Sequence, residues 1–248
     1  MALKIVYEPA GRAGEYSALA ANLYSGCDHG CIYCYAPAAT RKHRDVFNCP
    51  KPRDGLLSKL MDDAEELEKL HEQRSILLSF TCDSYQKIDE RYKLTRGALS
   101  ILLSHGLNVT ILTKGGKRSE RDFDILAQYK DQVTYAATLV FTNEEDRLRY
   151  ETGTATPTEE RIEALKHAHE LGIKTWVSLE PVFDPAQSLE LIRMTHDFVD
   201  LYKVGTLNYM PEAKLIDWKK FGKDAVALLE SLGKDYYIKN DLKVYLND

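Results

Sequence analysis

The sequence lacks any long apolar run. No stretch of its 248 residues approaches the roughly 20 consecutive apolar residues that a membrane-spanning helix needs. The first residues, MALKIVYEPAGRAGEY, also lack the apolar core of a secretory signal. We therefore expect a chain that does not enter a membrane and that works in the cytoplasm.

The sequence also lacks an excess of positive charge. It carries 33 Lys and Arg against 38 Asp and Glu, a formal net charge of −5, which argues against a protein that coats nucleic acid non-specifically. A local basic groove stays open. Two basic stretches exist, residues 41–44 (RKHR) extended by Lys51 and Arg53, and residues 114–118 (KGGKR) extended by Arg121. Each is read most simply as a solvated loop.

Cysteines are few and unevenly placed. The chain has five, an odd number, and three of them fall within eight residues. Without an export signal, reduced thiols are expected, which favours metal binding or catalysis over disulfides. Internal repeats, low-complexity tracts and linker-like stretches are missing as well. We therefore expect a single domain over residues 1–248.

What the sequence does contain is an alternation of strand-like and helix-like segments. The apolar patterns predict six strands, at residues 18–23, 75–80, 108–113, 133–141, 174–179 and 201–205. Helices are predicted at residues 56–73, 95–104, 120–129, 157–171, 188–198 and 217–232. The fourth helix has the clearest start, because Thr156 can cap it, Pro157 suits its first position and Glu159 completes a capping box.

Strands that alternate with helices indicate an α/β fold with a parallel sheet. Eight such units would close a full barrel, so six predict a partial (β/α)6 barrel of the TIM type that is open on one side. The core is expected over about residues 16–208. A helix and a Tyr-rich tail, about residues 209–248, would form a short C-terminal extension.

Polar residues follow every predicted strand. The carboxyl ends of parallel strands gather at one edge of the sheet, where function concentrates in such folds. The six ends carry the cysteine loop, residues 81–84 (TCDS), residues 113–116 (TKGG), residues 138–143, residues 180–181 (EP) and residues 205–208. The sequence thus predicts one polar site at this edge.

The cysteine loop, YSGCDHGCIYCY, places Cys27, Cys31 and Cys34 together. Structural zinc needs four ligands, which His29, His43 or Cys49 could complete, but such sites usually have two paired knuckles and only one is present. A 4Fe–4S cluster takes one ligand on each iron, so three cysteines leave one iron open to bind a small molecule. Cys49 as the fourth ligand of a closed cluster stays an alternative.

The loop carries a family resemblance. CDHGCIYC has the C-x3-C-x2-C form of radical S-adenosylmethionine (SAM) enzymes, with an aromatic residue before the third cysteine. The longer stretch YSGCDHGCIYCYA resembles the spore photoproduct lyase-like branch, to which DNA repair enzymes belong. Residues 137–182 (ATLVFTNEEDRLRYETGTATPTEERIEALKHAHELGIKTWVSLEPV) are similar to its central portion. The resemblance covers most of residues 22–182.

The resemblance implies the cofactors and several roles. The cofactors would be a 4Fe–4S cluster held by Cys27, Cys31 and Cys34, and SAM on the fourth iron. The other residues that it implies at the SAM site are Tyr33 near the adenine, Lys114 at the SAM carboxylate, and the hydroxyls of Thr138 and Ser84. Glu180 is expected either to bind ribose or to anchor the mouth of the barrel.

Cys82 has a counterpart of similar position in spore photoproduct lyase, where a cysteine returns a hydrogen atom to the product radical. A thiol suits this task because its S–H bond is weak, although a free cysteine can also serve as a small buried apolar residue. The implied activity is reductive cleavage of SAM to a 5′-deoxyadenosyl radical that takes hydrogen from a substrate. An electron donor such as flavodoxin or ferredoxin is the implied partner.

The substrate is not fixed by the motif, because one fold serves many substrates. A nucleic-acid lesion or a modified nucleotide is the expectation that follows from the branch. The alternative is a non-enzymatic metal-binding module in which the cysteines, with Cys49 or a histidine, only hold a zinc ion or a closed cluster.

Overall fold

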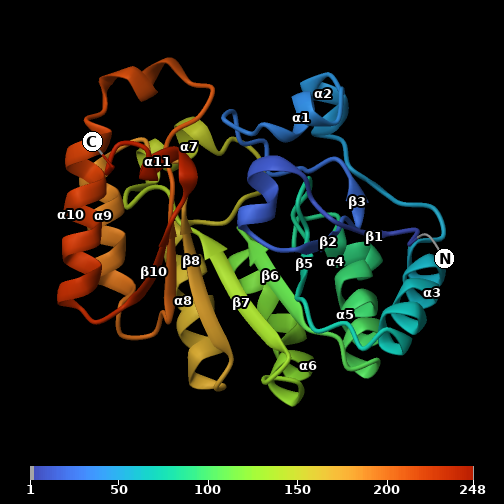
Figure 1. Cartoon of the computed structure of the whole chain (residues 1–248). Helices are drawn as coiled ribbons and strands as arrows, with labels where there is room; N and C mark the ends of the chain where they lie inside the picture. Colours follow the sequence, from blue (N-terminus) through green and yellow to red (C-terminus); the bar gives the residue numbers. More distant parts are fainter. Residues whose placement is uncertain (1–2, 248) are drawn as a thin grey trace.

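The computed structural model describes residues 3–247, and in them one curved sheet of eight strands forms the frame of the molecule (Figure 1). Its spatial order is β1-β2-β5-β6-β7-β8-β9-β10. The strands are β1 (Val6–Tyr7), β2 (Leu19–Ala21), β5 (Ile76–Leu78), β6 (Val109–Thr113), β7 (Val133–Thr138), β8 (Lys174–Leu179), β9 (Leu201–Val204) and β10 (Asp235–Ile238). Only β1 is antiparallel to its neighbour.

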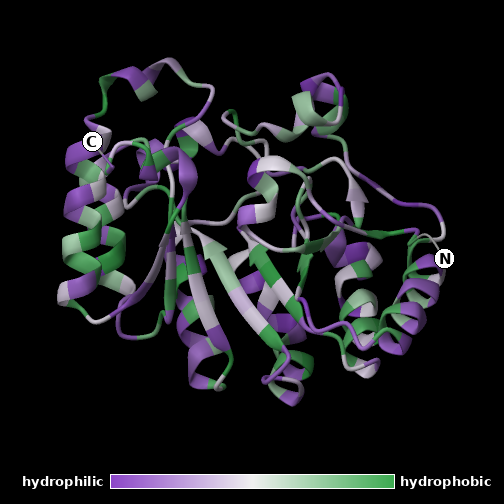
Figure 2. Cartoon of the chain, in the orientation of Figure 1, coloured by the Kyte–Doolittle hydropathy of each residue, from purple (hydrophilic) through white to green (hydrophobic). Residues whose placement is uncertain are grey.

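The helices between these strands cover the outer face of the sheet. They include α3 (Leu56–Lys69), α5 (Leu94–Ser104), α6 (Phe123–Gln128), α8 (Thr158–Glu170), α9 (Pro185–Thr195) and α10 (Trp218–Ser231). Helix α3 buries Leu60, Ala64 and Leu67, which recur at helical spacing, and it packs against α5. Figure 2 shows hydrophobic residues along strands such as β6, and hydrophilic residues mixed with hydrophobic ones along the helices, as expected for helices with one buried face. The core therefore lies between the sheet and these helices.

The partial barrel that the sequence predicts is confirmed. The described chain does not close the sheet into a barrel, and its parallel strands follow one another with helical crossovers. Two strands join the sheet beyond the six expected, β1 at one edge and β10 at the other. Strand β10 comes from the Tyr-rich tail, so the C-terminal extension supplies part of the same sheet.

Several predicted boundaries need correction. The helix expected at residues 120–129 is divided into a 3-10 helix, η2 (Gly116–Asp122), and α6. The helix expected to reach residue 73 ends at Lys69. Thr156 does not cap α8. The cap position is Pro157, whose side chain makes no capping hydrogen bond, and the Thr156 hydroxyl donates instead to the Lys114 carbonyl, 3.1 Å away.

Short elements cover the outer side of the cysteine loop. A two-stranded sheet pairs β3 (Tyr24–Ser25) with β4 (Lys51–Pro52), and α1 (Ala36–Ala39) and α2 (Arg44–Phe47) lie between them in sequence. Figure 1 shows α1 and α2 standing apart from the helices of the main sheet. Among residues 3–247, no helix has both the length and the apolar character needed to cross a membrane.

Candidate cofactor and active site

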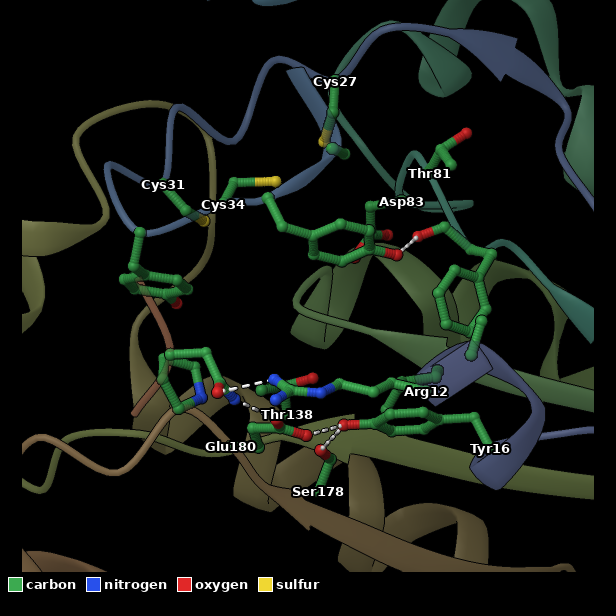
Figure 3. Close-up of a pocket in the computed structure, with 18 of the residues that line it drawn as sticks. Arg12, Tyr16, Cys27, Cys31, Cys34, Thr81, Asp83, Thr138, Ser178 and Glu180 are labelled. Carbon is green, nitrogen blue, oxygen red and sulfur yellow. Dashed lines mark hydrogen bonds between the residues drawn. The ribbon is translucent and has the colours of Figure 1, made fainter. Parts of the chain in front are cut away.

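A cavity of about 520 Å³ opens at the carboxyl ends of the strands, where the sequence places the polar residues. Its size is that of a site for a small organic ligand. Cys27, Cys31 and Cys34 line one side of it, and Glu180 and Tyr16 face them from the other (Figure 3). The structure therefore brings the cysteine loop and the ends of distant strands to one space.

The cysteine loop is held from behind by residues 150–154 (YETGT). Their backbones are joined by hydrogen bonds from Ile32 N to Tyr150 O at 2.9 Å, from Gly153 N to His29 O at 3.0 Å and from Thr154 N to Asp28 O at 3.0 Å. The fit is close, since a Cβ on Gly153 would lie 2.2 Å from the Asp28 carbonyl oxygen. This support, more than 100 residues away in sequence, was missed by the sequence reasoning.

A buried ion pair extends this support to Tyr33. Arg161 and Glu151 form a salt bridge with side chains that are 1% and 0% exposed, and the Tyr33 hydroxyl donates to the same Glu151 carboxylate. Burial opposes ionisation, but the Arg161 guanidinium outweighs it and lowers the pKa of Glu151 below its ordinary value. The carboxylate thus stays charged and fixes the Tyr33 ring in the cavity wall.

Lys114 reaches the cavity from the end of β6. Its ammonium lies 5.6 Å from the centre of the Tyr33 ring, and its backbone N–H donates to the Asp83 carboxylate at 2.7 Å. Asp83 also accepts from the Thr113 hydroxyl at 2.6 Å. Burial works against the charge of Asp83, yet nearby His29 and these hydrogen bonds hold its pKa below the ordinary value. Asp83 thereby joins the ends of two strands.

The turn after β5 places Cys82 in the cavity wall, with 9% of its surface exposed. Burial raises the pKa of Cys82, so the thiol keeps its proton at neutral pH. Ser84 differs from its expected position. It is fully buried, its hydroxyl lies 3.1 Å from the Ser79 hydroxyl, and it is Ser79 that lines the cavity. Ser84 therefore faces the core rather than the SAM site.

Thr138 and Glu180 lie where the sequence predicts, at the ends of β7 and beyond β8, and both line the cavity. The Glu180 carboxylate is already engaged. It accepts from the Tyr16 hydroxyl at 2.5 Å and from Asn208 Nδ2 at 3.2 Å, and it pairs with Lys239. This arrangement suits an anchor of the cavity floor better than a free ribose ligand.

The floor includes residues that the sequence reasoning missed. Arg12 and Tyr16 come from the N-terminal segment around η1 (Gly11–Glu15), and Lys239, which is 2% exposed, follows β10. Arg12 Nη1 donates to Asn208 Oδ1 at 2.6 Å. Lys239 is a polar residue directly after a strand, which is the signal used for the other cavity residues. That signal can be read only if residues 235–238 are recognised as a strand.

The donor set fits an iron–sulfur cluster. In residues 3–247, no three Cys, His, Asp or Glu side chains lie close enough together to hold one metal ion. Cys27, Cys31 and Cys34 all line the wall of one cavity, and a cluster takes one thiolate on each of several irons. Of the described residues, the wall includes neither Cys49 nor His43, and both are exposed. Cys49 is thus poorly placed as a fourth ligand.

His29 lines the cavity but is engaged elsewhere. Its Nδ1 lies 3.5 Å from the Asp83 carboxylate, and its Nε2 lies 3.3 Å from Arg118. Arg118 in turn donates to the carbonyls of Tyr85 and Thr154. Arg118 of the second basic stretch therefore joins the loop to its support, whereas Lys117 of the same stretch is exposed to solvent.

Related sequences occur in a virus, an archaeon and bacteria, in proteins that carry the description uncharacterized. One from Acidianus two-tailed virus is 28% identical over 199 residues, which are 77% of this chain and 65% of the relative. One from Methanocaldococcus jannaschii is 29% identical over 193 residues, 75% of this chain and 69% of the relative. One from Mycobacterium tuberculosis is 31% identical over 170 residues, 65% of this chain and 48% of the relative. The chain thus spans less than two thirds of the viral and mycobacterial relatives.

Spore photoproduct lyase and SuiB are among the solved structures that share the fold. Spore photoproduct lyase complexed with dinucleoside spore photoproduct superposes with a TM-score of 0.73 at 13% identity, covering 96% of this chain and 79% of the lyase. Streptococcus suis SuiB bound to S-adenosylmethionine gives a TM-score of 0.67 at 14% identity, covering 91% of this chain and 51% of SuiB. At these identities the likeness establishes the fold alone.

The family model of the radical SAM superfamily matches residues 21–199, which include the cysteine loop and the strands from β5 to β8. This match, together with a cavity that gathers three cysteines at the strand ends, decides the family. The chain belongs to the radical SAM superfamily, and the cofactors of this family are a 4Fe–4S cluster and S-adenosylmethionine.

Proposed function

We propose that Cys27, Cys31 and Cys34 hold the cluster, and that the enzyme removes a hydrogen atom from an organic substrate bound in the same cavity. The observation that carries this proposal is that all three thiols line one cavity with Lys114 and Cys82. When bound, the cluster and SAM supply reductive cleavage to methionine and a 5′-deoxyadenosyl radical. The protein supplies ligation, orientation and exclusion of water.

Three cavity residues are assigned to SAM. The Lys114 ammonium is the cation for the SAM carboxylate, a task that suits a flexible point charge. Tyr33, fixed by Glu151, forms the wall beside the adenine, and Thr138 offers a hydroxyl at the end of β7. Glu180 acts through the floor: its contacts with Tyr16, Lys239 and Asn208 hold the segments that close the cavity.

Cys82 is assigned as the hydrogen donor to the product radical. It lines the cavity, and its thiol is protonated because burial raises its pKa. Donation of the hydrogen atom leaves a thiyl radical on Cys82, and one electron from the reductant and one proton restore the thiol. The overall outcome is a lyase-like or repair reaction in which the substrate radical is quenched within the protein.

The substrate to test first is a damaged or modified nucleotide in nucleic acid. Support comes from the spore photoproduct lyase structure, which holds a dinucleoside and shares the fold over 96% of this chain. The electron donor is a protein such as flavodoxin or ferredoxin. Residues from both ends of the chain, Arg12 and Lys239 among them, line the cavity, which supports a single domain over residues 1–248.

The first test is anaerobic. The protein is reconstituted with iron and sulfide, reduced with dithionite and given SAM, and 5′-deoxyadenosine is quantified. We expect product from the native chain and from Cys49→Ala, and none from Cys31→Ala. A fully loaded cluster that yields no 5′-deoxyadenosine would refute the proposal. Loss of cluster in Cys49→Ala would instead favour the closed site with Cys49 as fourth ligand.

The role of Cys82 has its own test. Cys82→Ala should cleave SAM at the native rate while the substrate radical is diverted to other products, as followed by mass spectrometry. Cys82→Ser keeps the size and a hydroxyl but has a much stronger O–H bond, so it should divert products in the same way. Native products from either variant would leave Cys82 with a packing role only.

A further inference from the structure

A basic surface on the outer side of the cysteine loop is left unexplained by the cavity. We define it by five residues from the segment between α1 and α3: Arg41, Lys42, Arg44, Lys51 and Arg53. We infer that this outer basic surface is the docking site for a small acidic one-electron donor protein. The inference rests on the proposed function, because it names where the reductant of that same site binds.

The charge of this surface is not neutralised within the protein. Over residues 41–53 the one acidic residue is Asp45, which lies 3.3 Å from His43. Within the described chain none of the five cations forms a salt bridge; Lys42, for example, contacts the Ser25 hydroxyl. The second basic stretch differs, since Lys117 pairs with Glu163 and Arg121 with Asp89. Unpaired charge on a chain of net charge −5 indicates a partner of opposite sign.

The surface lies directly against the cluster loop. Arg44 donates from its guanidinium to the carbonyls of Cys31 at 2.8 Å and of Cys34 at 3.2 Å. The Cys27 N–H donates to the Phe47 carbonyl, at the end of α2, at 2.9 Å. One layer of backbone thus separates the outer basic surface from the residues that hold the cluster. An electron that enters here has a short path that avoids the cavity.

Apolar residues stand among the cations. Ile32, inside the cysteine motif, is 39% exposed, and Val46 on α2 is 63% exposed. Transient protein partners commonly meet through a small apolar centre surrounded by charged residues, and the charges steer the encounter. The outer basic surface has both parts. The chemistry of the partner is therefore that of a small acidic protein with an exposed redox group.

A nucleic-acid strand is the competing occupant, and the geometry disfavours it. None of the five cations is part of the cavity wall that the described residues form. A strand whose modified base enters the cavity needs its phosphates held at the mouth, so cations on the far side of the loop serve it poorly. An electron donor needs a docking surface outside the cavity, because SAM and substrate occupy the cavity itself.

The test compares two charge-reversed double variants with the same change in net charge. One is Arg41→Glu with Lys51→Glu, two exposed residues without a role in holding the loop. The control is Lys219→Glu with Lys223→Glu, exposed positions on α10 at the other end of the sheet (Figure 1). The probe is an acidic flavodoxin, titrated by calorimetry into the anaerobically reconstituted proteins.

We expect the Arg41/Lys51 variant to bind flavodoxin about tenfold or more weakly at low salt, and the control within about twofold of the native chain. Native binding should also weaken as salt rises from 50 to 200 mM. With flavodoxin as reductant, formation of 5′-deoxyadenosine should fall in parallel. With dithionite, which needs no docking surface, both variants should match the native chain.

Equal affinity of the two variants for flavodoxin would overturn the inference. A variant that loses affinity for a single-stranded oligonucleotide while keeping native affinity for flavodoxin would assign the surface to nucleic acid instead. If the native chain formed no 5′-deoxyadenosine with dithionite, the proposed function itself would be refuted. This result is distinguishable from failure of the docking inference, because the affinity for flavodoxin is measured without turnover.

Discussion

The contact between the cysteine loop and residues 150–154 can be tested by one methyl group. In Gly153→Ala, the new Cβ would lie 2.2 Å from Asp28 O and 2.5 Å from the His29 carbonyl carbon. Both are backbone atoms, which cannot rotate away as the end of a side chain can. The two segments must therefore separate by about 1 Å, a distance at which close-packed contacts are lost.

The cost follows from the contacts that hold the segments together. Separation weakens two backbone hydrogen bonds, from Gly153 N and Thr154 N, each worth about 1 kcal/mol. Overpacking adds about 1–3 kcal/mol. The free energy of unfolding should thus fall by about 3–5 kcal/mol, which for a chain of this size lowers the melting temperature by roughly 10 °C.

The assay is thermal unfolding of the apo protein, followed by the iron content after anaerobic reconstitution. We expect Gly153→Ala to bind less iron, because the displaced loop holds the three cysteines in a changed arrangement. Gly14→Ala is the matched control, since its Cβ would meet only Pro9 O at an ordinary 3.5 Å. Native stability and native iron content in Gly153→Ala would refute the reasoning.

Three further predictions concern buried or cavity charges. Arg161→Met should lower the free energy of unfolding by about 3–5 kcal/mol, because Glu151 is left buried without its cation; adding Glu151→Gln should recover part of the loss in urea titrations. Burial lowers the pKa of Lys203 to about 8, whereas the pKa of a lysine in an unfolded chain is about 10.4. Between these two pH values the unfolded chain therefore binds more protons than the folded chain. The stability of the native chain relative to Lys203→Met should therefore rise from pH 8 to 9.5, and a difference that stays flat would contradict this. Lys114→Met should weaken SAM binding to the reconstituted protein by about ten- to hundredfold, measured by calorimetry, whereas Lys117→Met should not.

Much of the site could be predicted because its signals are local. Three cysteines within eight residues limit the chemistry before any fold is known. Apolar runs such as those of β6 and β8 are buried on both faces, so they stand out in the sequence. Residues just beyond such runs, among them Lys114 and Glu180, must gather at one edge of a parallel sheet.

Other parts could not be predicted because their signals are weak in the sequence. Strand β10 (DYYI) alternates exposed and half-buried residues at the edge of the sheet, so it lacks a continuous apolar run. Without that strand, Lys239 has no expected place. Ser84 shows the opposite problem: it lies in a predicted strand-end segment, but the turn directs its side chain into the core.

The sequence by itself determined the cysteine spacing, the order of strands and helices, and hence the family chemistry. These follow from short-range patterns, since periodicity and ligand spacing act over a few residues. Only the tertiary structure decided which residues surround that chemistry. Glu151 accepts a hydrogen bond from Tyr33, 118 residues away in sequence, and Lys239 pairs with Glu180, 59 residues away. Gly153 packs against the cysteine loop. The physical reason is that such pairs are brought together by the folding of the whole sheet, which local sequence does not record.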